Sequence, residues 1–117
     1  MEQVGVIIPC HTKEEFDQQL QKAIESKKLV VIDFTATWCG PCRIMLPLLE
    51  DWAKEFPHVL FLKVDVDELK SVTSDWDVEA MPTFILVKEG NILERIVGVR
   101  KQELRQKIEE HHSTSAA

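Results

Sequence analysis

The sequence predicts an α/β sandwich whose sheet has a parallel portion and an antiparallel edge hairpin. Apolar β-branched runs alternate with segments of helical periodicity along most of the chain, which is the pattern of strands joined by helices. Near the end, two strand-like runs follow each other directly across a turn, which indicates a hairpin. With 117 residues, the chain is long enough to bury one core.

The first strand is expected at residues 4–8, a short β-branched run that Pro9 closes. Thr12 and Glu15 then form a capping box, because the Thr hydroxyl and the Glu carboxylate can each accept a bond from the other's amide group. Apolar residues at helical spacing continue this helix to about Ser26.

The middle of the chain predicts two strands and two helices. Residues 29–34 are almost continuously apolar, as expected of a central strand that helices cover on both faces. A longer helix is expected over residues 41–56, where Pro47 should produce a kink. Residues 59–66 form the next strand, and residues 69–76 form a short helix.

The last third predicts the edge hairpin and a closing helix. Residues 83–87 and 92–97 flank the turn residues 89–91. A helix over residues 101–110 ends the fold, and a short flexible tail is expected at about residues 112–117.

Composition and charge exclude several classes of protein. The hydrophobic share of 44% and the charged share of 29% are those of a globular chain, and we expect one domain over residues 1–117. A net charge of −6 gives no general attraction for phosphate backbones, so we expect no nucleic-acid partner. We also expect no membrane association, and a cytoplasmic location, because no apolar run is long enough to span a bilayer and the first residues lack a positive secretory region.

Two of the three cysteines carry the strongest chemical signal. Cys39 and Cys42 enclose Gly40-Pro41 where the central strand gives way to the longer helix. At a helix start, unpaired amides and the dipole stabilise a thiolate, which favours Cys39 as the more ionised and more exposed thiol. Cys42 lies one turn further on, within reach of a disulfide.

Two other interpretations of the cysteine pair remain open at this point: a zinc half-site, or two structural thiols. Zinc needs four ligands, and the sequence has neither a second pair of this spacing nor a spaced histidine pair. The remaining candidate ligands are Cys10, His11, His58, His111 and His112. Cys10 itself is interpreted as a small buried residue, with a regulatory disulfide or dimer as the alternative.

Asp33 interrupts the apolar central strand and has two interpretations. It is either an exposed carboxylate at the strand end or a buried carboxyl group with a raised pKa, which could accept the proton of Cys42. Lys63 lies either near Asp33 or on the exposed side of an alternating strand.

Several motifs in order make this chain resemble the thioredoxin family, and in particular its plant h-type group. The matching segments are Cys10-His11-Thr12, Asp33 to Arg43, Phe61 to Glu68, Ala80 to Phe84, and Val97-Gly98. The resemblance covers almost the whole chain and implies the thioredoxin fold, with a central mixed five-stranded sheet flanked by four helices. A departure is Met45-Leu46, because the family usually has Ile-Ala before the helix proline, and the larger Leu46 adds volume beneath the active-site helix.

The resemblance implies a protein-disulfide reductase. Cys39 would attack a target disulfide, Cys42 would resolve the mixed disulfide, and Asp33 would accept a proton. The substrate-binding surface would comprise Trp38, Gly40, Pro41, Met81, Pro82 and Gly98, with a cis peptide bond before Pro82.

The resemblance also implies a monomer with no bound cofactor or metal. Its redox group is the Cys39–Cys42 disulfide, and its electrons would come from NADPH through thioredoxin reductase or from glutathione and glutaredoxin. The partners are then one of these reducing systems and disulfide-containing target proteins. The alternatives are a disulfide isomerase, which differs in reduction potential, and a non-catalytic interaction module of the same fold.

Overall fold

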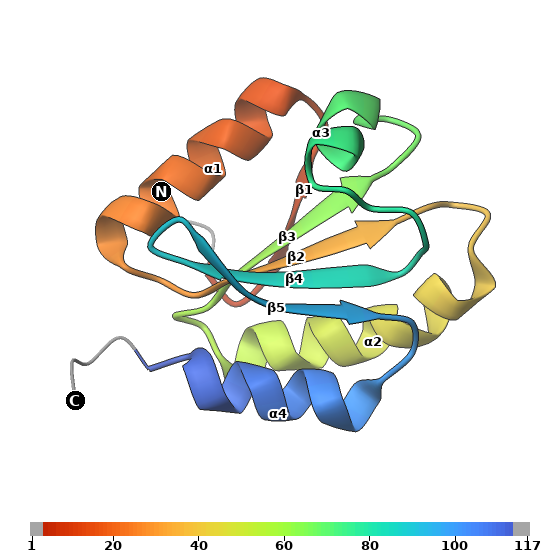
Figure 1. Ribbon diagram of the computed structural model, residues 1–117. Coiled ribbons are helices and arrows are strands. Elements are labelled where there is room, and N and C mark those ends of the chain that lie inside the picture. The colour runs from red at the N-terminus through yellow and green to blue at the C-terminus, as the bar shows by residue number, and fades with distance from the viewer. Residues whose placement is uncertain (1–3, 114–117) are drawn as a thin grey trace.

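Five strands form one mixed sheet in the order β1-β3-β2-β4-β5, in a computed structural model that describes residues 4–113 (Figure 1). The strands are β1 (Ile7–Cys10), β2 (Val30–Thr35), β3 (Leu60–Asp65), β4 (Thr83–Lys88) and β5 (Asn91–Val97). The helices are α1 (Lys13–Ser26), α2 (Gly40–Glu55), α3 (Lys70–Asp75) and α4 (Lys101–His111). Strands β1, β3 and β2 run parallel, whereas β4 and β5 are antiparallel to their neighbours. The mixed sheet with four helices that the sequence predicted is therefore confirmed.

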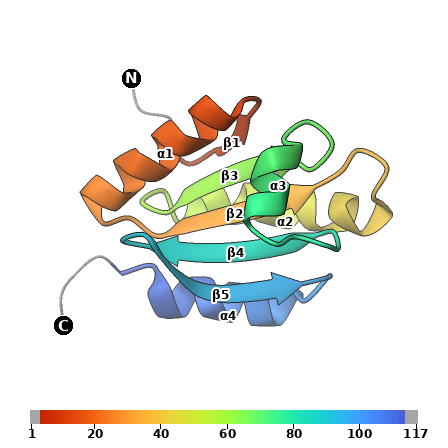
Figure 2. The ribbon, with the colours of Figure 1, turned by 45° about the horizontal axis from the view of Figure 1, so that its top comes forward.

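Helices cover both faces of the sheet (Figures 1 and 2). Helices α1 and α3 lie on one face, and α2 and α4 lie on the other. Because β2 is central, its side chains alternate between two cores: Val30, Ile32 and Phe34 pack toward α1 and α3, whereas Val31 packs toward α2 and α4. Asp33 therefore projects from β2 toward the face covered by α2.

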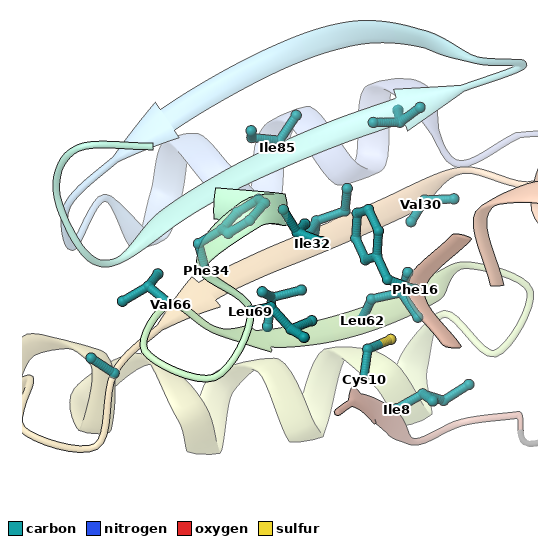
Figure 3. Close-up of a cluster of buried hydrophobic side chains, with 14 of the residues drawn as sticks. Ile8, Cys10, Phe16, Val30, Ile32, Phe34, Leu62, Val66, Leu69 and Ile85 are labelled. Atoms are coloured by element: carbon teal, nitrogen blue, oxygen red, sulfur yellow. The ribbon is translucent and has the colours of Figure 1, made fainter. Parts of the chain in front are cut away.

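The core beneath α1 and α3 is shown in Figure 3. Phe16 of α1 and Leu62 of β3 are almost fully buried in it, beside the Cys10 side chain. The Trp76 ring lies 5.7 Å from that of Phe16, centroid to centroid, in an edge-to-face arrangement, so Trp76 serves packing as expected. Trp52 is also buried, in the core on the other face, as its helical spacing predicted.

The first strand differs from its prediction. It begins at Ile7 and continues through Pro9 to Cys10, rather than ending before Pro9. Since β1 lies at the edge of the sheet and pairs only with β3, a proline without an amide donor is tolerated there. Gly5, just before β1, has a φ of 72°, a left-handed conformation that glycine adopts without strain.

The capping of α1 confirms half of the predicted capping box. The amide of Glu15 donates to the hydroxyl of Thr12 at 3.1 Å, as expected of the residue before the helix. The Glu15 carboxylate, however, accepts from the amide of His11 at 2.8 Å rather than from that of Thr12. The reciprocal bond therefore moves one residue outward, which extends the cap into the link between β1 and α1.

Local contacts define the turn between β4 and β5 and the end of α4. Glu89 and Gly90 both have positive φ, at 53° and 84°, which is the geometry of a tight hairpin turn between β4 and β5. At the end of α4, His112 caps the helix and its ring nitrogen lies 2.7 Å from that of His58. Residues 114–117 of the expected tail lie outside the described residues.

Within residues 4–113, no helix combines the length and the apolar composition needed to cross a bilayer.

Candidate active site

The central strand β2 leads directly into the cysteine pair at the start of α2. Cys39 is the N-cap of this helix, and Pro41 occupies its first turn, where no amide donor is needed. A disulfide joins Cys39 to Cys42 across a Cα–Cα distance of 5.3 Å. The amide of Cys42 also donates to Sγ of Cys39 at 3.2 Å, so the free end of the helix is directed at this sulfur.

One expectation about the pair is wrong in this oxidised form. Cys39 was expected to be more exposed than Cys42, yet their exposed fractions are 4% and 7%. The bond to Cys42 and the amide contact turn the Cys39 sulfur back over the first helical turn. The exposed groups here are instead Trp38, Gly40 and Pro41, which surround Cys39 in the sequence.

Asp33 is buried, which decides between its two interpretations. Only 6% of the residue is exposed, and its Oδ1 has no hydrogen-bond partner among the described residues. Burial away from water raises the pKa of this carboxyl from 3.8 to about 7, although the positive charge of Lys63 opposes the shift. Lys63 is the register partner of Asp33 on β3, so the expected proximity of the two residues is confirmed.

Asp33 and Cys42 border the same hollow behind the disulfide. Its volume is about 290 Å³, and it is lined by Asp33, Thr35, Ala36, Thr37, Cys42, Arg43, Leu46, Lys63 and Asp65. A hollow of this size can hold several waters, and its polar lining offers them partners. The second cysteine and the buried carboxyl group therefore face a common space.

The start of β4 lies beside the end of β2 and brings a proline to the site. Phe34 pairs with Thr83, so the preceding residues Met81 and Pro82 reach the neighbourhood of the disulfide. The Met81–Pro82 peptide bond is cis, as the resemblance implied. The amide of Gly98, whose φ is 92°, donates to the carbonyl of Pro82 at 2.9 Å, which joins the loop after β5 to this turn.

Two hydrogen bonds that sequence reasoning missed hold the loop between β2 and α2. The indole Nε1 of Trp38 donates to Asp67 at 2.8 Å, and the guanidinium of Arg43 donates to the carbonyl of Thr37 at 2.7 Å. The Trp38 side chain is thereby fixed although 63% of the residue is exposed. The first bond has no local sequence signal, since Asp67 is 29 residues from Trp38. The second joins residues six apart and depends on the conformation of the loop.

Exposed apolar residues around Gly98 were also missed. Val97 and Val99 flank this glycine and are 44% and 39% exposed. The sequence shows two valines beside a loop glycine, but residue type alone does not distinguish an exposed valine from a buried one. They add exposed apolar side chains beside the loop that is bonded to Pro82.

The structure does not assemble the zinc site considered from the sequence. Both sulfurs of the pair are used in a disulfide, whereas zinc requires thiolates. Cys10 is buried, and the pKa of its thiol is raised to about 11, chiefly by burial. His11 contacts Glu68, and His111 contacts Glu94, so these two histidines are directed at separate carboxylates.

The geometry supports one kind of chemistry above others. A helix start stabilises negative charge on one sulfur, a second sulfur lies in bonding range, and a buried carboxyl group with a raised pKa borders the same hollow. This arrangement can exchange a dithiol for a disulfide while moving a proton.

Comparisons with known proteins agree with this chemistry. The family model described as Thioredoxin matches residues 7–110. The chain is 61% identical to Thioredoxin H1 of Arabidopsis thaliana over 107 residues, which cover 92% of this chain and 94% of that protein. It is 56% identical to Thioredoxin H-type 1 of Nicotiana tabacum, covering 92% of this chain and 85% of that one. The crystal structure of thioredoxin NaTrxh from Nicotiana alata superposes with a TM-score of 0.90 at 39% identity, over 97% of this chain and 98% of the other.

Proposed function

This chain belongs to the thioredoxin family and reduces disulfides in target proteins through Cys39 and Cys42; we propose that Cys39 attacks first and that Cys42 resolves. The observation that carries this order is the position of Cys39 at the N-cap of α2, where its sulfur accepts a hydrogen bond from the Cys42 amide. That bond and the helix dipole stabilise the Cys39 thiolate over its thiol.

The exchange proceeds in two displacements. The Cys39 thiolate forms a bond to one sulfur of the target disulfide, and the other target sulfur leaves as a thiolate. Cys42 then attacks Sγ of Cys39, which releases the second target sulfur and closes the Cys39–Cys42 disulfide. Two electrons pass to the target, and the dithiol of this protein is oxidised.

Asp33 is proposed as the acceptor of the Cys42 proton in the second displacement. Its support is the hollow that both residues border, together with a pKa of about 7 that lets the carboxyl group gain and lose a proton near neutrality. Water in the hollow carries the proton where the two groups are not in direct contact.

The target segment is proposed to bind across the surface around the disulfide. This surface comprises Trp38, Gly40, Pro41, Met81, Pro82 and Gly98. One support is the hydrogen bond from Gly98 to Pro82, which joins the loop after β5 to the loop before β4. The other is the exposure of Trp38. An extended segment could pair with the Met81 backbone as an added strand.

A cysteine substitution tests the order of attack. Cys42→Ser should accumulate a covalent adduct with a disulfide-containing target, because the resolving sulfur is missing. Mass spectrometry should locate the adduct at Cys39, and thiol reductants should release it. The matched variant Cys39→Ser should yield little adduct; adducts that form only at Cys42 would contradict the proposed order.

The protein is proposed to act in the cytoplasm as a single-domain monomer.

The source of its electrons is proposed to be NADPH through thioredoxin reductase, or glutathione with glutaredoxin. The test is to supply each reducing system separately and to follow NADPH consumption with a model protein disulfide. Turnover with one system identifies the donor, and turnover with neither would contradict both.

A further inference from the structure

A second hollow lies next to the one that contains Asp33. Its volume is about 450 Å³, and its lining comes mainly from α2, from β1 and from the residues just before β1. It is lined by Gly5, Val6, Ile7, Pro9, Leu46, Glu50, Asp51, Lys54 and Lys63. Leu46 and Lys63 also line the first hollow, so these two side chains stand at the boundary between the two spaces.

The two boundary residues differ in what they offer to water. Lys63 carries an ammonium group that is readily hydrated, whereas Leu46 presents only apolar atoms. Leu46 is half-buried on α2, one turn after Cys42. It is therefore the apolar part of the partition between the charged second hollow and the space beside Asp33.

The partition matters because an oxygen of Asp33 on one side of it lacks a hydrogen-bond partner among the described residues. Asp33 is buried, and its Oδ1 has no hydrogen-bond partner in the part of the chain that is described. Such an atom is costly to keep dry when the carboxyl group is ionised. Water that enters past Leu46 would add to the water that the first hollow can hold, and it would be attracted to this oxygen.

We propose that Leu46 is a positioning residue that restricts the hydration of Asp33 from the second hollow and thereby tunes proton exchange between Asp33 and Cys42. This inference rests on the proposed role of Asp33 as the proton acceptor. Leu46 takes no part in making or breaking bonds in this scheme, and it acts through Asp33.

Several charged groups surround Asp33 and also influence the titration of its carboxyl group. Lys63 faces it from β3, Arg43 borders the hollow from α2, and Asp65 borders it from the end of β3. In the dithiol form, Cys42 adds a titrating thiol. Leu46→Ala changes none of these charges, so a change in the titration of Asp33 in this variant reports hydration.

The direct test is the titration of the Asp33 carboxyl group by ¹³C NMR in the oxidised protein, where Cys42 does not titrate. Leu46→Ala opens the partition, and better solvation of the carboxylate should lower the midpoint by about one pH unit. Leu46→Met retains an apolar side chain of similar volume and should leave the midpoint unchanged.

Ile44→Ala is the matched control on the same helix. Ile44 is 53% exposed and belongs to the lining of neither hollow in the described residues. The Asp33 midpoint in Ile44→Ala should therefore equal that of the parent protein. An unchanged or raised midpoint in Leu46→Ala overturns the inference. An equal shift in Ile44→Ala also overturns it, because the effect would then belong to the helix as a whole.

A kinetic readout separates this inference from the proposed function. In the dithiol form, the pH profile for release of a target from its mixed disulfide should shift to lower pH in Leu46→Ala, in parallel with the Asp33 midpoint. If Asp33→Asn leaves the parental pH profile unchanged, the role of Asp33 fails, whatever Leu46→Ala does to the titration. If Asp33→Asn changes the profile while Leu46→Ala leaves the midpoint in place, only the inference about Leu46 fails.

Discussion

At the residue scale, three cysteines of one chain differ because of where each sulfur lies. Cys39 and Cys42 meet at a helix start, where amides stabilise a thiolate. Cys10 lies at the end of an edge strand with only 1% of the residue exposed, and both burial and the nearby Glu15 raise the pKa of its thiol. A thiol with a pKa of about 11 is almost wholly protonated at neutral pH, so Cys10 is a packing residue.

Cys10 should therefore be unreactive in the folded, reduced protein. A thiol reagent at pH 8 should modify two cysteines rapidly, and the third only after denaturant is added. Cys10→Ser should leave the rapid phase and the oligomeric state unchanged. Rapid modification of three thiols, or a disulfide-linked dimer that Cys10→Ser abolishes, would contradict this expectation.

The residues of the site were predictable to different degrees. The cysteine pair was recognisable by its spacing between the central strand and the longer helix, and Asp33 was recognisable because it interrupts an apolar strand. The contacts of Trp38 with Asp67 and of Arg43 with Thr37 could not be predicted, because they depend on loop geometry rather than on spacing. The predicted exposure of Cys39 is wrong because it applies to a free thiol at a helix start, whereas the structure contains the disulfide.

At the scale of elements, hydrophobic patterning located every helix and strand to within a few residues. The largest difference is at β1, because the sequence predicts that the strand ends before Pro9 and it continues to Cys10. A proline excludes a central strand but not an edge strand, and local sequence does not reveal which strand will be the edge. The hairpin was predictable because Glu89-Gly90 supplies the turn conformation that its two strands require.

The cap of α1 allows a prediction for a single element. Thr12→Ala removes the acceptor of the Glu15 amide and should reduce the free energy of unfolding by about 1 kcal/mol. Thr12→Ser keeps the hydroxyl and should retain most of that stability. Urea denaturation of the three proteins gives the comparison, and equal stability of Thr12→Ala and the parent would show that the cap contributes nothing.

At the scale of the whole molecule, a core lies on each face of the sheet, and the buried Asp33 projects from β2 toward the face that α2 covers. The order of predicted elements was enough to give the layered architecture, because alternating strands and helices have few ways to bury their apolar faces. The two hollows beside Leu46 were beyond prediction, since they depend on how side chains from β1, β3 and α2 fail to fill the space between them.

Asp33 should make the stability of the whole protein depend on pH. Its pKa is 3.8 in the unfolded chain and about 7 in the folded protein, so the folded state binds more protons between these values. The free energy of unfolding contributed by this group should therefore be highest below pH 4 and fall as the pH rises to about 7. The full difference is on the order of 4 kcal/mol.

Asp33→Asn removes this dependence because its amide does not ionise. The variant should be more stable than the parent at pH 8, and the advantage should disappear near pH 4. Denaturant unfolding of both oxidised proteins at pH 4, 6 and 8 measures this difference in the free energy of unfolding. Asp75→Asn, at an exposed position on α3, is the control and should show little difference at any of these pH values. A constant advantage of Asp33→Asn across the range would mean that Asp33 does not titrate as described.

The central claim is that the helix start presents Cys39 as the ionised sulfur that begins the exchange. The most direct measurement is the alkylation rate of each cysteine in the reduced protein as a function of pH, followed by peptide mass spectrometry. Cys39 should react first, with a midpoint below the ordinary thiol value of ~8.5. Faster alkylation of Cys42, or a Cys39 midpoint at or above that value, would contradict the claim.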